Sequence, residues 1–583
     1  MNQRTRNSGM VLGEVASSGL ARGTAILCAC ANRITVARRV ISPNEVEAEI
    51  VKLDAALAIV EDQLIDLQKK VQQSLGDQSA GIFEAHIALL RAPSLRKEIR
   101  AGCLDRHINV EAAVEESIEK LVSTFAQVEE PYLRERAADL EDLGRRLLDV
   151  LTRDQPSENP VFPQGSVLVT SELLPSVTAR LDRETIRGVV VERGGQTAHA
   201  TILARELGVP LLIRVPDAMK RIRTGDRLVV DGLAGRVFIN PTAHILREYD
   251  RLESDLHAHR TALQTMVELP PVTSDGTRIR LSANIGKTAD APAAAAANAD
   301  GIGLYRTEFV FLVQDHLPSE EEQYRIYRAT AEYSKPRHVV IRLLDIGGDK
   351  PLHYFPLSAE ANPSLGLRGT RLLLAHAEIL RTQTRAILRL NATHPVSILL
   401  PMVGDVEDVR AVKTIIESVK AQLAAEHQTF DPRIPIGAMI ETPSAAVMIG
   451  RLAREVDFLS IGTNDLVQYL LTTDRTSSTL APYYEPVHPA VLHVLASLAS
   501  TAGEKNKDIS ICGEMAGNPA YTRLLLGLGF RSLSVAPGEL LEVKHTIRST
   551  SMEEARALAE RVLQCDTVEE IKSHLGLAHQ RRA

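Results

Sequence analysis

The stretch "GIGLYRTEFVF" at residues 301–311 begins with a short apolar run that ends at Arg306. Seven further apolar runs alternate with helical stretches after residue 278: "IRLSANIG", "VVIRLLD", "SILLPMV", "IPIGAMIE", "FLSIG", "ISICGE" and "SLSVAP". A set of eight β/α units in about 300 residues is typical of a TIM (β/α)8 barrel. We therefore predict that residues 269–583 form such a barrel, and that the alanine run "APAAAAANA" at 291–299 is its first helix.

Several polar residues lie within these runs or soon after them, and active sites of this fold lie at the C-terminal ends of the strands. They are Arg306, Arg342, Glu441, Asn464, Asp465 and Cys512. Each one alone has an ordinary explanation, such as a rim salt bridge, a solvated carboxylate, a turn or an inert buried thiol. Their shared placement predicts a functional site.

The residue types at this predicted site favour a phosphorylated anion as substrate. Glu441 and Asp465 could bind one Mg²⁺, a hard cation that needs few protein ligands and takes the rest from water and phosphate. Arg306, Arg342 and Arg475 offer guanidinium groups that suit phosphate and carboxylate.

A long helical pattern precedes the barrel. Ser42, Pro43 and Glu45 form a helix-start signal at residue 42, and an apolar seam then continues to residue 75. The seam consists of Val46, Ile50, Leu53, Leu57, Val60, Leu64, Leu67 and Val71. Similar spacing returns from Val110 to Phe125 and from Leu133 to Leu151. We predict a helical bundle over residues 35–152.

Short β-rich runs flank this bundle and indicate an α/β domain that it interrupts, formed by residues 1–34 and 153–241. The runs are "GTAILCA", "SVLVT", "GVVVE", "PLLIR", "RLVVDG" and "GRVFIN". Residues 242–268 are polar and helix-favouring, and they predict a linker helix before the barrel.

The segment "GGQTAHATILARELG" at residues 194–208 places His199 among small residues in the first turn of a predicted helix that Gly208 ends. A phosphate group is favoured at a helix N-terminus, and a histidine there could act as the nucleophile toward phosphorus. An exposed or core histidine is the more common explanation for any one of the 17 histidines. The motif alone does not decide between them.

Composition excludes several classes of protein. Apolar residues make up 44% and charged residues 24% of the chain, as in soluble globular proteins, and no apolar run approaches the roughly 20 residues that cross a bilayer. The net charge of −7 argues against a general nucleic-acid binder. The N-terminus has no secretion signal and the 5 cysteines form no CxxC pair, so we expect a cytosolic protein without membrane insertion.

The chain resembles Enzyme I, the phosphoenolpyruvate-protein phosphotransferase family of the sugar phosphotransferase system. The resemblance covers nearly the whole chain and is carried by eight motifs. They are "GGQTAHATILARELGVP", "ERAADLEDLGRRLL", "GIGLYRTEFVF", "RLLDIGGDKP", "NPSLGLRGTR", "GAMIETPSAA", "SIGTNDLVQYLLTTDR" and "ICGEMAG". Several also occur in pyruvate phosphate dikinase and phosphoenolpyruvate synthase, but those enzymes carry a large ATP-binding domain for which this chain has no room.

The resemblance implies a role for each residue of the predicted site. His199 would be phosphorylated through Nε2, and Cys512 would protonate the enolate to give pyruvate. Glu441 and Asp465 would bind Mg²⁺. The residues that would hold phosphoenolpyruvate are Arg306, Arg342, Asn464, Asp465 and Arg475. The helical bundle would dock the HPr phosphocarrier, and the barrel would form a homodimer.

The sequence departs from the family pattern near the histidine. Leu174 replaces a hydroxyl residue, Gln196 and Ala198 stand where Arg and Ser are common, and "SSG" at residues 17–19 replaces "SPG". These changes leave the tuning of His199 and the choice of carrier open, and they remove no residue assigned to bond making. Two alternatives stay open: a nitrogen-related regulatory paralogue that acts on a different HPr-like carrier, and a non-catalytic signalling scaffold.

Overall fold

The structure is a computed structural model of the chain. It describes residues 9–28, 36–75, 77–126, 131–152, 162–173, 175–178, 181, 185–195, 201, 204–205, 207–348, 352, 354–358, 360–477 and 479–577. The chain divides into two compact units, residues 1–257 and 258–583, and the division falls within the helix α9 (Ala243–Gln264). This helix lies inside the predicted linker.

The first unit contains an eight-stranded mixed sheet with the order β1-β8-β7-β3-β4-β5-β6-β2. Its strands are β1 (Gly9–Leu12), β2 (Glu14–Ser17), β3 (Leu20–Cys28), β4 (Ser166–Thr170), β5 (Ile186–Val191), β6 (Leu211–Ile213), β7 (Arg227–Asp231) and β8 (Arg236–Ile239). Two apolar cores cover the sheet, and the short helices α6 (Pro175–Thr178) and α8 (Ala218–Arg221) accompany it. All six predicted strands are present.

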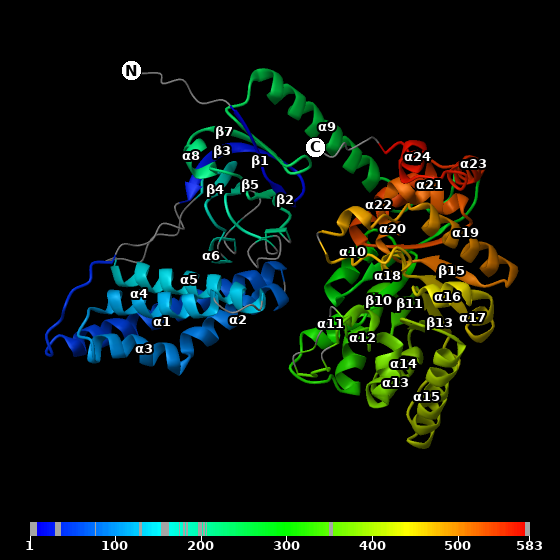
Figure 1. Cartoon of the computed structure of the whole chain (residues 1–583), viewed down its shortest axis with the longest axis horizontal. Coiled ribbons are helices and arrows are strands. Elements are labelled where there is room, and N and C mark those ends of the chain that lie inside the picture. Colours follow the sequence, from blue (N-terminus) through cyan, green and yellow to red (C-terminus); the bar gives the residue numbers. More distant parts are fainter. Residues whose placement is uncertain are drawn as a thin grey trace. The chain divides into compact units, whose positions relative to one another are not determined.

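Five helices inserted between β3 and β4 form the predicted bundle and lie side by side (Figure 1). They are α1 (Val46–Leu75), α2 (Asp77–Arg91), α3 (Pro93–Leu104), α4 (Val110–Ala126) and α5 (Pro131–Thr152). The seam of α1 is buried from Leu53 to Val71. Helix α1 starts three residues after Pro43, the first residue of the predicted helix, and residues 43–45 form a turn in which Glu45 accepts hydrogen bonds from the backbone and hydroxyl of Ser42.

The second unit is a closed barrel of eight parallel strands, in the order β10-β11-β12-β13-β14-β15-β16-β9. The strands are β9 (Arg280–Ile285), β10 (Gly301–Arg306), β11 (His338–Arg342), β12 (Val396–Leu400), β13 (Ile436–Ile440), β14 (Phe458–Ile461), β15 (Asp508–Ile511) and β16 (Ser532–Val535). Each predicted apolar run overlaps one of them. The TIM barrel prediction is confirmed.

Helices surround the barrel and bury one continuous apolar core against it (Figure 1). The outer helices are α10 (Ala291–Ala296), α12 (Glu320–Ser334), α14 (Ala377–Asn391), α15 (Val406–Ala425), α17 (Ile449–Glu455), α19 (Pro489–Glu504), α21 (Pro519–Gly527), α22 (Leu540–Arg548), α23 (Met552–Val562) and α24 (Val568–His574). The short helices α11 (Glu308–Leu312), α13 (Gly369–Ala375), α16 (Pro443–Val447), α18 (Thr463–Leu470) and α20 (Glu514–Gly517) lie in the connections that leave the strand ends.

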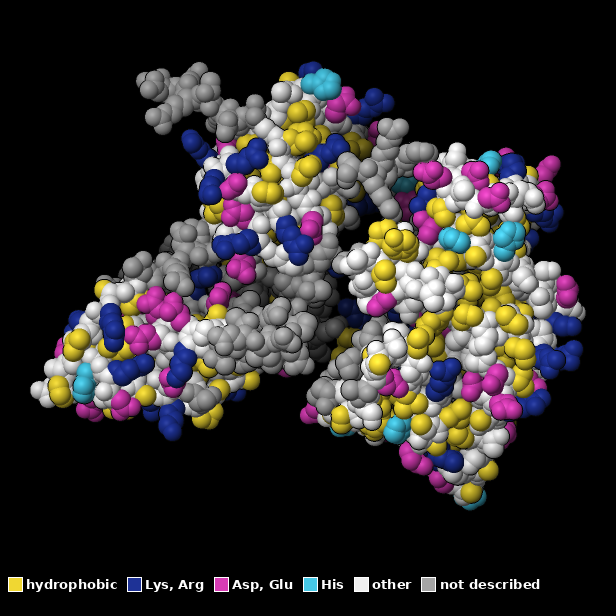
Figure 2. Space-filling view, in the orientation of Figure 1, with side chains coloured by type: hydrophobic (Ala, Val, Ile, Leu, Met, Phe, Trp, Pro, Cys, Tyr) yellow, Lys and Arg dark blue, Asp and Glu magenta, His cyan; other side chains and the backbone are white. Residues whose placement is uncertain are grey.

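Charges of both signs are interspersed over the face of the molecule in Figure 2, which agrees with the small net charge of −7. Among the helices that the structure describes, none is long and apolar enough to cross a membrane.

Candidate active site

The barrel brings the polar residues of the second unit to one end, because the carboxyl ends of parallel strands meet there. Arg306 and Arg342 are the last residues of β10 and β11, and their Cα atoms are partners in the strand register. Glu441 follows β13, Asn464 and Asp465 lie in the first turn of α18 after β14, and Cys512 follows β15.

Arg342 is buried and held by carboxylates. Its guanidinium contacts Glu308, and Nη1 lies 3.5 Å from Asp345 Oδ2. Burial alone would lower the pKa of Arg342, but the charges of Glu308 and Asp345 raise it. The side chain is therefore a fixed cation that has little freedom to change direction.

Arg368 is a second buried arginine in this network, and the sequence analysis gave it no role. Its Nε and Nη2 donate to Asp345 at 3.2 and 2.8 Å, and its Nη1 lies 3.3 Å from Asp465 Oδ1. The same Nη1 donates to the hydroxyl of Tyr469 at 3.2 Å. Arg368 and Asp345 lie within quoted motifs, "NPSLGLRGTR" and "RLLDIGGDKP", but Arg368 is far from any strand end in the sequence.

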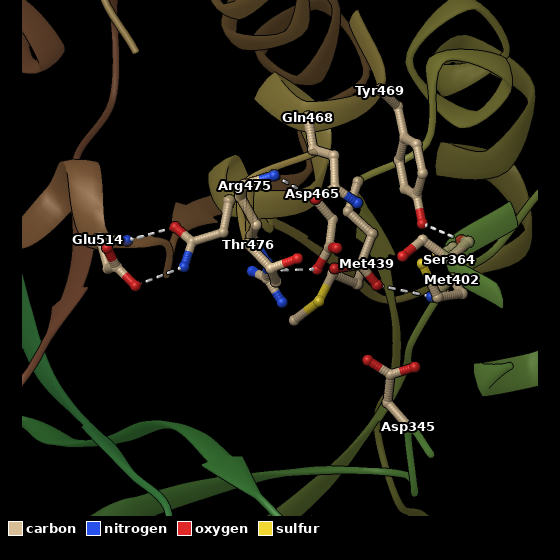
Figure 3. A network of polar contacts seen from close by, with 12 residues as sticks. Asp345, Ser364, Met402, Met439, Asp465, Gln468, Tyr469, Arg475, Thr476 and Glu514 are labelled. Atoms are coloured by element: carbon tan, nitrogen blue, oxygen red, sulfur yellow. Dashed lines mark hydrogen bonds and ion pairs between the residues drawn. The ribbon is translucent and has the colours of Figure 1, made fainter. Parts of the chain in front are cut away.

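Asp465 thus receives one guanidinium from Arg368, and Arg475 Nη1 lies 3.9 Å from its other oxygen. Figure 3 shows the Asp465 carboxylate facing Arg475, with Tyr469 directed at Ser364. The Tyr469 hydroxyl donates to the carbonyl of Ser364 at 2.5 Å. These contacts fix one oxygen of Asp465 more firmly than the other.

Glu441 is the least compensated carboxylate of the site. Its Oε1 accepts a hydrogen bond from the backbone N–H of Met402 at 2.7 Å. A Cβ at Gly462 would lie 2.6 Å from Oε2, so only glycine fits beside it. Burial and then the charge of Asp465 raise the pKa of Glu441 to about 7, although Arg342 opposes the shift.

Cys512 lies in a small apolar cluster with Leu304, Leu399 and Met439. Its Sγ accepts a hydrogen bond from the Ser460 hydroxyl at 3.2 Å and can donate to the Ile461 carbonyl at 3.3 Å. Burial raises the pKa of this thiol, while the Ser460 hydrogen bond and the charge of Arg306 oppose the rise. The group is thus a neutral S–H at physiological pH, as a proton donor must be.

The side chain of Asn464 forms two hydrogen bonds with Glu514. Its amide nitrogen donates to Glu514 Oε1 at 2.9 Å, and its amide oxygen accepts from the Glu514 backbone N–H at 2.9 Å. The backbone carbonyl of Asn464 accepts from the hydroxyl of Tyr484 at 3.1 Å. The Asn464 amide therefore has a defined orientation at the rim.

A cavity of about 720 Å³ opens next to these residues and is lined by Met402, Thr442, Gln468 and Tyr469 among others. This volume lies within the usual range for small-molecule sites. Its charged lining residues are Arg371 and Asp474.

The donor set fits a hard divalent cation. Within the described ranges, no group of three or more His, Cys, Asp or Glu side chains could hold a metal ion. Glu441 and Asp465 supply carboxylate oxygens from two adjacent strand ends, and Mg²⁺ often binds through one or two carboxylates plus substrate phosphate. The like charge that raises the pKa of Glu441 is what such an ion would neutralise.

His199, Gln196, Ala198 and Leu174 lie outside the described residues. Described residues that follow His199 in the sequence make the contacts below. Gly208 has a φ of 65° and its N–H donates to the Arg205 carbonyl at 2.9 Å, the geometry that the predicted helix end requires. Arg205 Nε donates to the Ala16 carbonyl at 2.8 Å.

Three family descriptions match the chain in succession. They are "PEP-utilising enzyme, N-terminal" over residues 12–136, "PEP-utilising enzyme, mobile domain" over residues 162–235 and "PEP-utilising enzyme, PEP-binding domain" over residues 260–552. The last of these coincides with most of the barrel.

Curated relatives match over almost their entire length. The phosphoenolpyruvate-protein phosphotransferase of Haemophilus influenzae is 37% identical over 562 residues, which cover 96% of this chain and 98% of the relative. The protein of the same name from Geobacillus stearothermophilus is 36% identical over 97% of this chain and 98% of its own. A third, from Staphylococcus carnosus, is 36% identical over 91% and 92%.

Proposed function

Because the chain belongs to the phosphoenolpyruvate-protein phosphotransferases, a family of PEP-utilising enzymes and transferases, we propose that it moves the phosphoryl group of phosphoenolpyruvate to His199 and then to the histidine of an HPr phosphocarrier. The observation that carries this proposal is the buried group of Glu441, Asp465, Arg342 and Arg368 at the barrel's C-terminal end. Such a group suits a small, multiply charged anion.

The arginines bind and orient the substrate. Arg342, already aligned by Glu308 and Asp345, and Arg306, its partner in the strand register, would contact the phosphate and carboxylate groups. Arg475 and Asn464 would hold the opposite side from α18 and the segment after it. Fixed donors of this kind stabilise the transition state without having to reorganise.

Glu441 and Asp465 would hold Mg²⁺, which when bound neutralises charge on the transferring phosphoryl group. Arg368 keeps one oxygen of Asp465 oriented through Nη1, and the Met402 N–H does the same for Glu441. These contacts orient one oxygen of each carboxylate, and the other oxygen of Asp465 lies 3.9 Å from Arg475 Nη1.

Cys512 completes the reaction. The P–O bond of phosphoenolpyruvate breaks as an N–P bond forms at Nε2 of His199, and the enolate of pyruvate remains in the barrel. The thiol of Cys512 gives its proton to the methylene carbon of the enolate, and the thiolate later recovers a proton from solvent. Leu304, Leu399 and Met439 keep water from the thiol during this step.

The carrier and assembly proposals concern other parts of the chain. The helical bundle over residues 35–152 would dock HPr, and a homodimer would form through the barrel. His199 must meet the barrel and then the carrier, so residues 242–268 would permit a rigid-body movement of the first unit. The location proposed for this chemistry is the cytosol.

Intact-mass measurement tests the proposed function. The purified chain is mixed with Mg²⁺ and phosphoenolpyruvate, and HPr is then added. We expect an acid-labile mass gain of one phosphoryl group that maps to His199, disappears when HPr is added, and is absent in His199→Ala. A gain that persists after HPr addition would favour a different carrier, as in the nitrogen-related alternative. No gain at all would favour a non-catalytic scaffold.

A further inference from the structure

A chain of buried polar side chains lies behind the arginines, in the outer layer of the barrel. Its centre is Gln383 on α14, whose side chain is 0% exposed. Buried amides of this kind are costly unless each polar atom has a partner. Both polar atoms of the Gln383 side chain, Oε1 and Nε2, have hydrogen-bond partners.

The partners of Gln383 belong to two neighbouring strand ends. Its Nε2 donates to Thr307 Oγ1 at 3.1 Å, directly after β10. Its Oε1 accepts from the backbone N–H of Leu344 at 2.9 Å, just after β11. Thr307 Oγ1 in turn donates to the backbone carbonyl of Arg342 at 2.9 Å, so the two strand ends are joined to each other as well.

The second N–H of the Gln383 amide has its partner on helix α12. Nε2 also donates to the hydroxyl of Tyr327 at 3.0 Å, and this hydroxyl donates to Gln323 Oε1 at 3.0 Å on the same helix, α12. The Tyr327 ring packs edge-on against Tyr305 in β10, with ring centres 5.8 Å apart. The amide plane of Gln383 therefore has one orientation.

The bonded positions border the site. Thr307 lies between Arg306 and Glu308, and Glu308 contacts the Arg342 guanidinium. Leu344 lies between Arg342 and Asp345, which pairs with both buried arginines. A rotation of either segment would change the distance between Arg306 and Arg342.

We propose that Gln383 is a positioning residue for the phosphoenolpyruvate site, which sets the spacing of Arg306 and Arg342 by bonding the two strand ends at Thr307 and Leu344. The inference rests on the proposed function for its substrate. Gln383 itself does not touch the reacting groups; it acts through the backbone that carries them.

The test compares Gln383→Leu with two controls in the full-length chain. Thr384→Val changes the next residue of α14, which is also 0% exposed and whose hydroxyl has no hydrogen-bond partner in the described part of the chain. Leu423→Ala empties a buried position of α15 away from the site and supplies a comparable loss of thermal stability. All variants are assayed well below their melting temperatures.

Two readouts separate positioning from stability. We expect Gln383→Leu to raise the KM for phosphoenolpyruvate by about tenfold, with both controls within about twofold of wild type. We also expect hydrogen exchange in segments 301–312 and 338–346 to be about tenfold faster in metal-free Gln383→Leu than in Leu423→Ala.

Equal KM values in Gln383→Leu and Leu423→Ala would overturn the proposal, as would unchanged exchange in both segments. If the wild-type chain does not react with phosphoenolpyruvate, the proposed function fails. The exchange measurement still decides whether Gln383 fixes the two strand ends.

Discussion

Glu49 in the helical bundle and Glu441 in the barrel are both buried glutamates, and the groups around them act on their charge in opposite ways. Glu49 in α1 is 2% exposed and Glu441 after β13 is 1% exposed, so both carboxylates have lost nearly all contact with water. Burial on this scale disfavours the charged form of a carboxylate. The difference between the two lies in the groups that replace the water.

Glu49 is surrounded by donors. Its carboxylate accepts from the Val110 backbone N–H at 2.9 Å, from Lys52 Nζ at 2.9 Å and from Arg39 Nη2 at 3.2 Å. Burial would raise its pKa, but the hydrogen bonds from Lys52 and Val110 and the charges of Lys52 and Arg39 lower it below its ordinary value. This carboxylate joins α1 to the start of α4.

Among the described residues, Glu441 accepts a hydrogen bond from one donor, the Met402 N–H, and a like charge, Asp465, lies nearby. Burial and then the charge of Asp465 raise its pKa to about 7. A buried carboxylate with compensating cations stabilises a fold, whereas one left beside a second carboxylate is ready to bind a cation. The comparison therefore assigns Glu49 to the fold of the bundle and supports the proposal that Glu441 binds a cation.

The largest expected effect comes from exchanging each acid for its amide. Glu441→Gln should reduce phosphorylation of the chain by phosphoenolpyruvate about a thousandfold, because it removes half of the proposed Mg²⁺ ligand pair. Glu49→Gln should leave this rate within about twofold. The rate of phosphoprotein formation at saturating Mg²⁺ is measured for both variants. A Glu441→Gln rate near that of wild type would contradict the assignment of Glu441 to the cation site.

Cys512 is a third buried titratable group, and its substitution extends the comparison of Glu49 with Glu441 to the proposed proton donor. Cys512→Ala should reduce pyruvate release about a hundredfold, because no other proton donor replaces the thiol in the apolar cluster. Substrate binding should change little, since the arginines remain. Pyruvate formation and phosphoenolpyruvate affinity are measured on the same variant, and a normal rate of pyruvate formation would exclude Cys512 as the acid.

Glu49→Gln should instead destabilise the helical bundle, by about 2 kcal/mol at pH 7. The folded-state pKa of Glu49 lies below the ordinary value, so its contribution is complete above that value and is lost as the pH falls through the folded pKa. Calorimetric melting temperatures of wild type and variant should therefore converge in acid. A constant difference between pH 7 and the acid limit would contradict this assignment.

The smallest expected effect is a gain in stability, opposite in sign to the loss expected for Glu49→Gln. The folded-state pKa of Glu441, about 7, exceeds its ordinary value of 4.5, so this group's contribution to stability falls as the pH rises between those two values. Metal-free Glu441→Gln should be more stable than wild type by about 1 kcal/mol at pH 8, since the buried amide retains part of the burial cost. This difference in stability between variant and wild type should vanish near pH 4.5. Melting temperatures of both proteins at pH 8 and pH 4.5 check this expectation.

The sequence predicted the barrel, the bundle and the polar strand ends because periodicity and strand-end placement are local patterns. It did not predict β1 and β2, two strands of only 4 residues at opposite edges of the sheet. Arg368, Asp345 and Gln383 were also missed as site residues. Their roles depend on contacts between residues far apart in the chain, such as Arg368 with Asp465 and Gln383 with Thr307, and no spacing in the sequence reports such contacts.

The most direct test of the contrast between Glu441 and Glu49 is Mn²⁺ binding, followed by electron paramagnetic resonance in the presence of phosphoenolpyruvate. His199→Ala serves as the background, because it removes the proposed nucleophile and lies outside the barrel. We expect one bound Mn²⁺ per chain in this background, unchanged binding when Glu49→Gln is added, and loss of binding when Glu441→Gln is added. Equal Mn²⁺ affinity in all three proteins would contradict it.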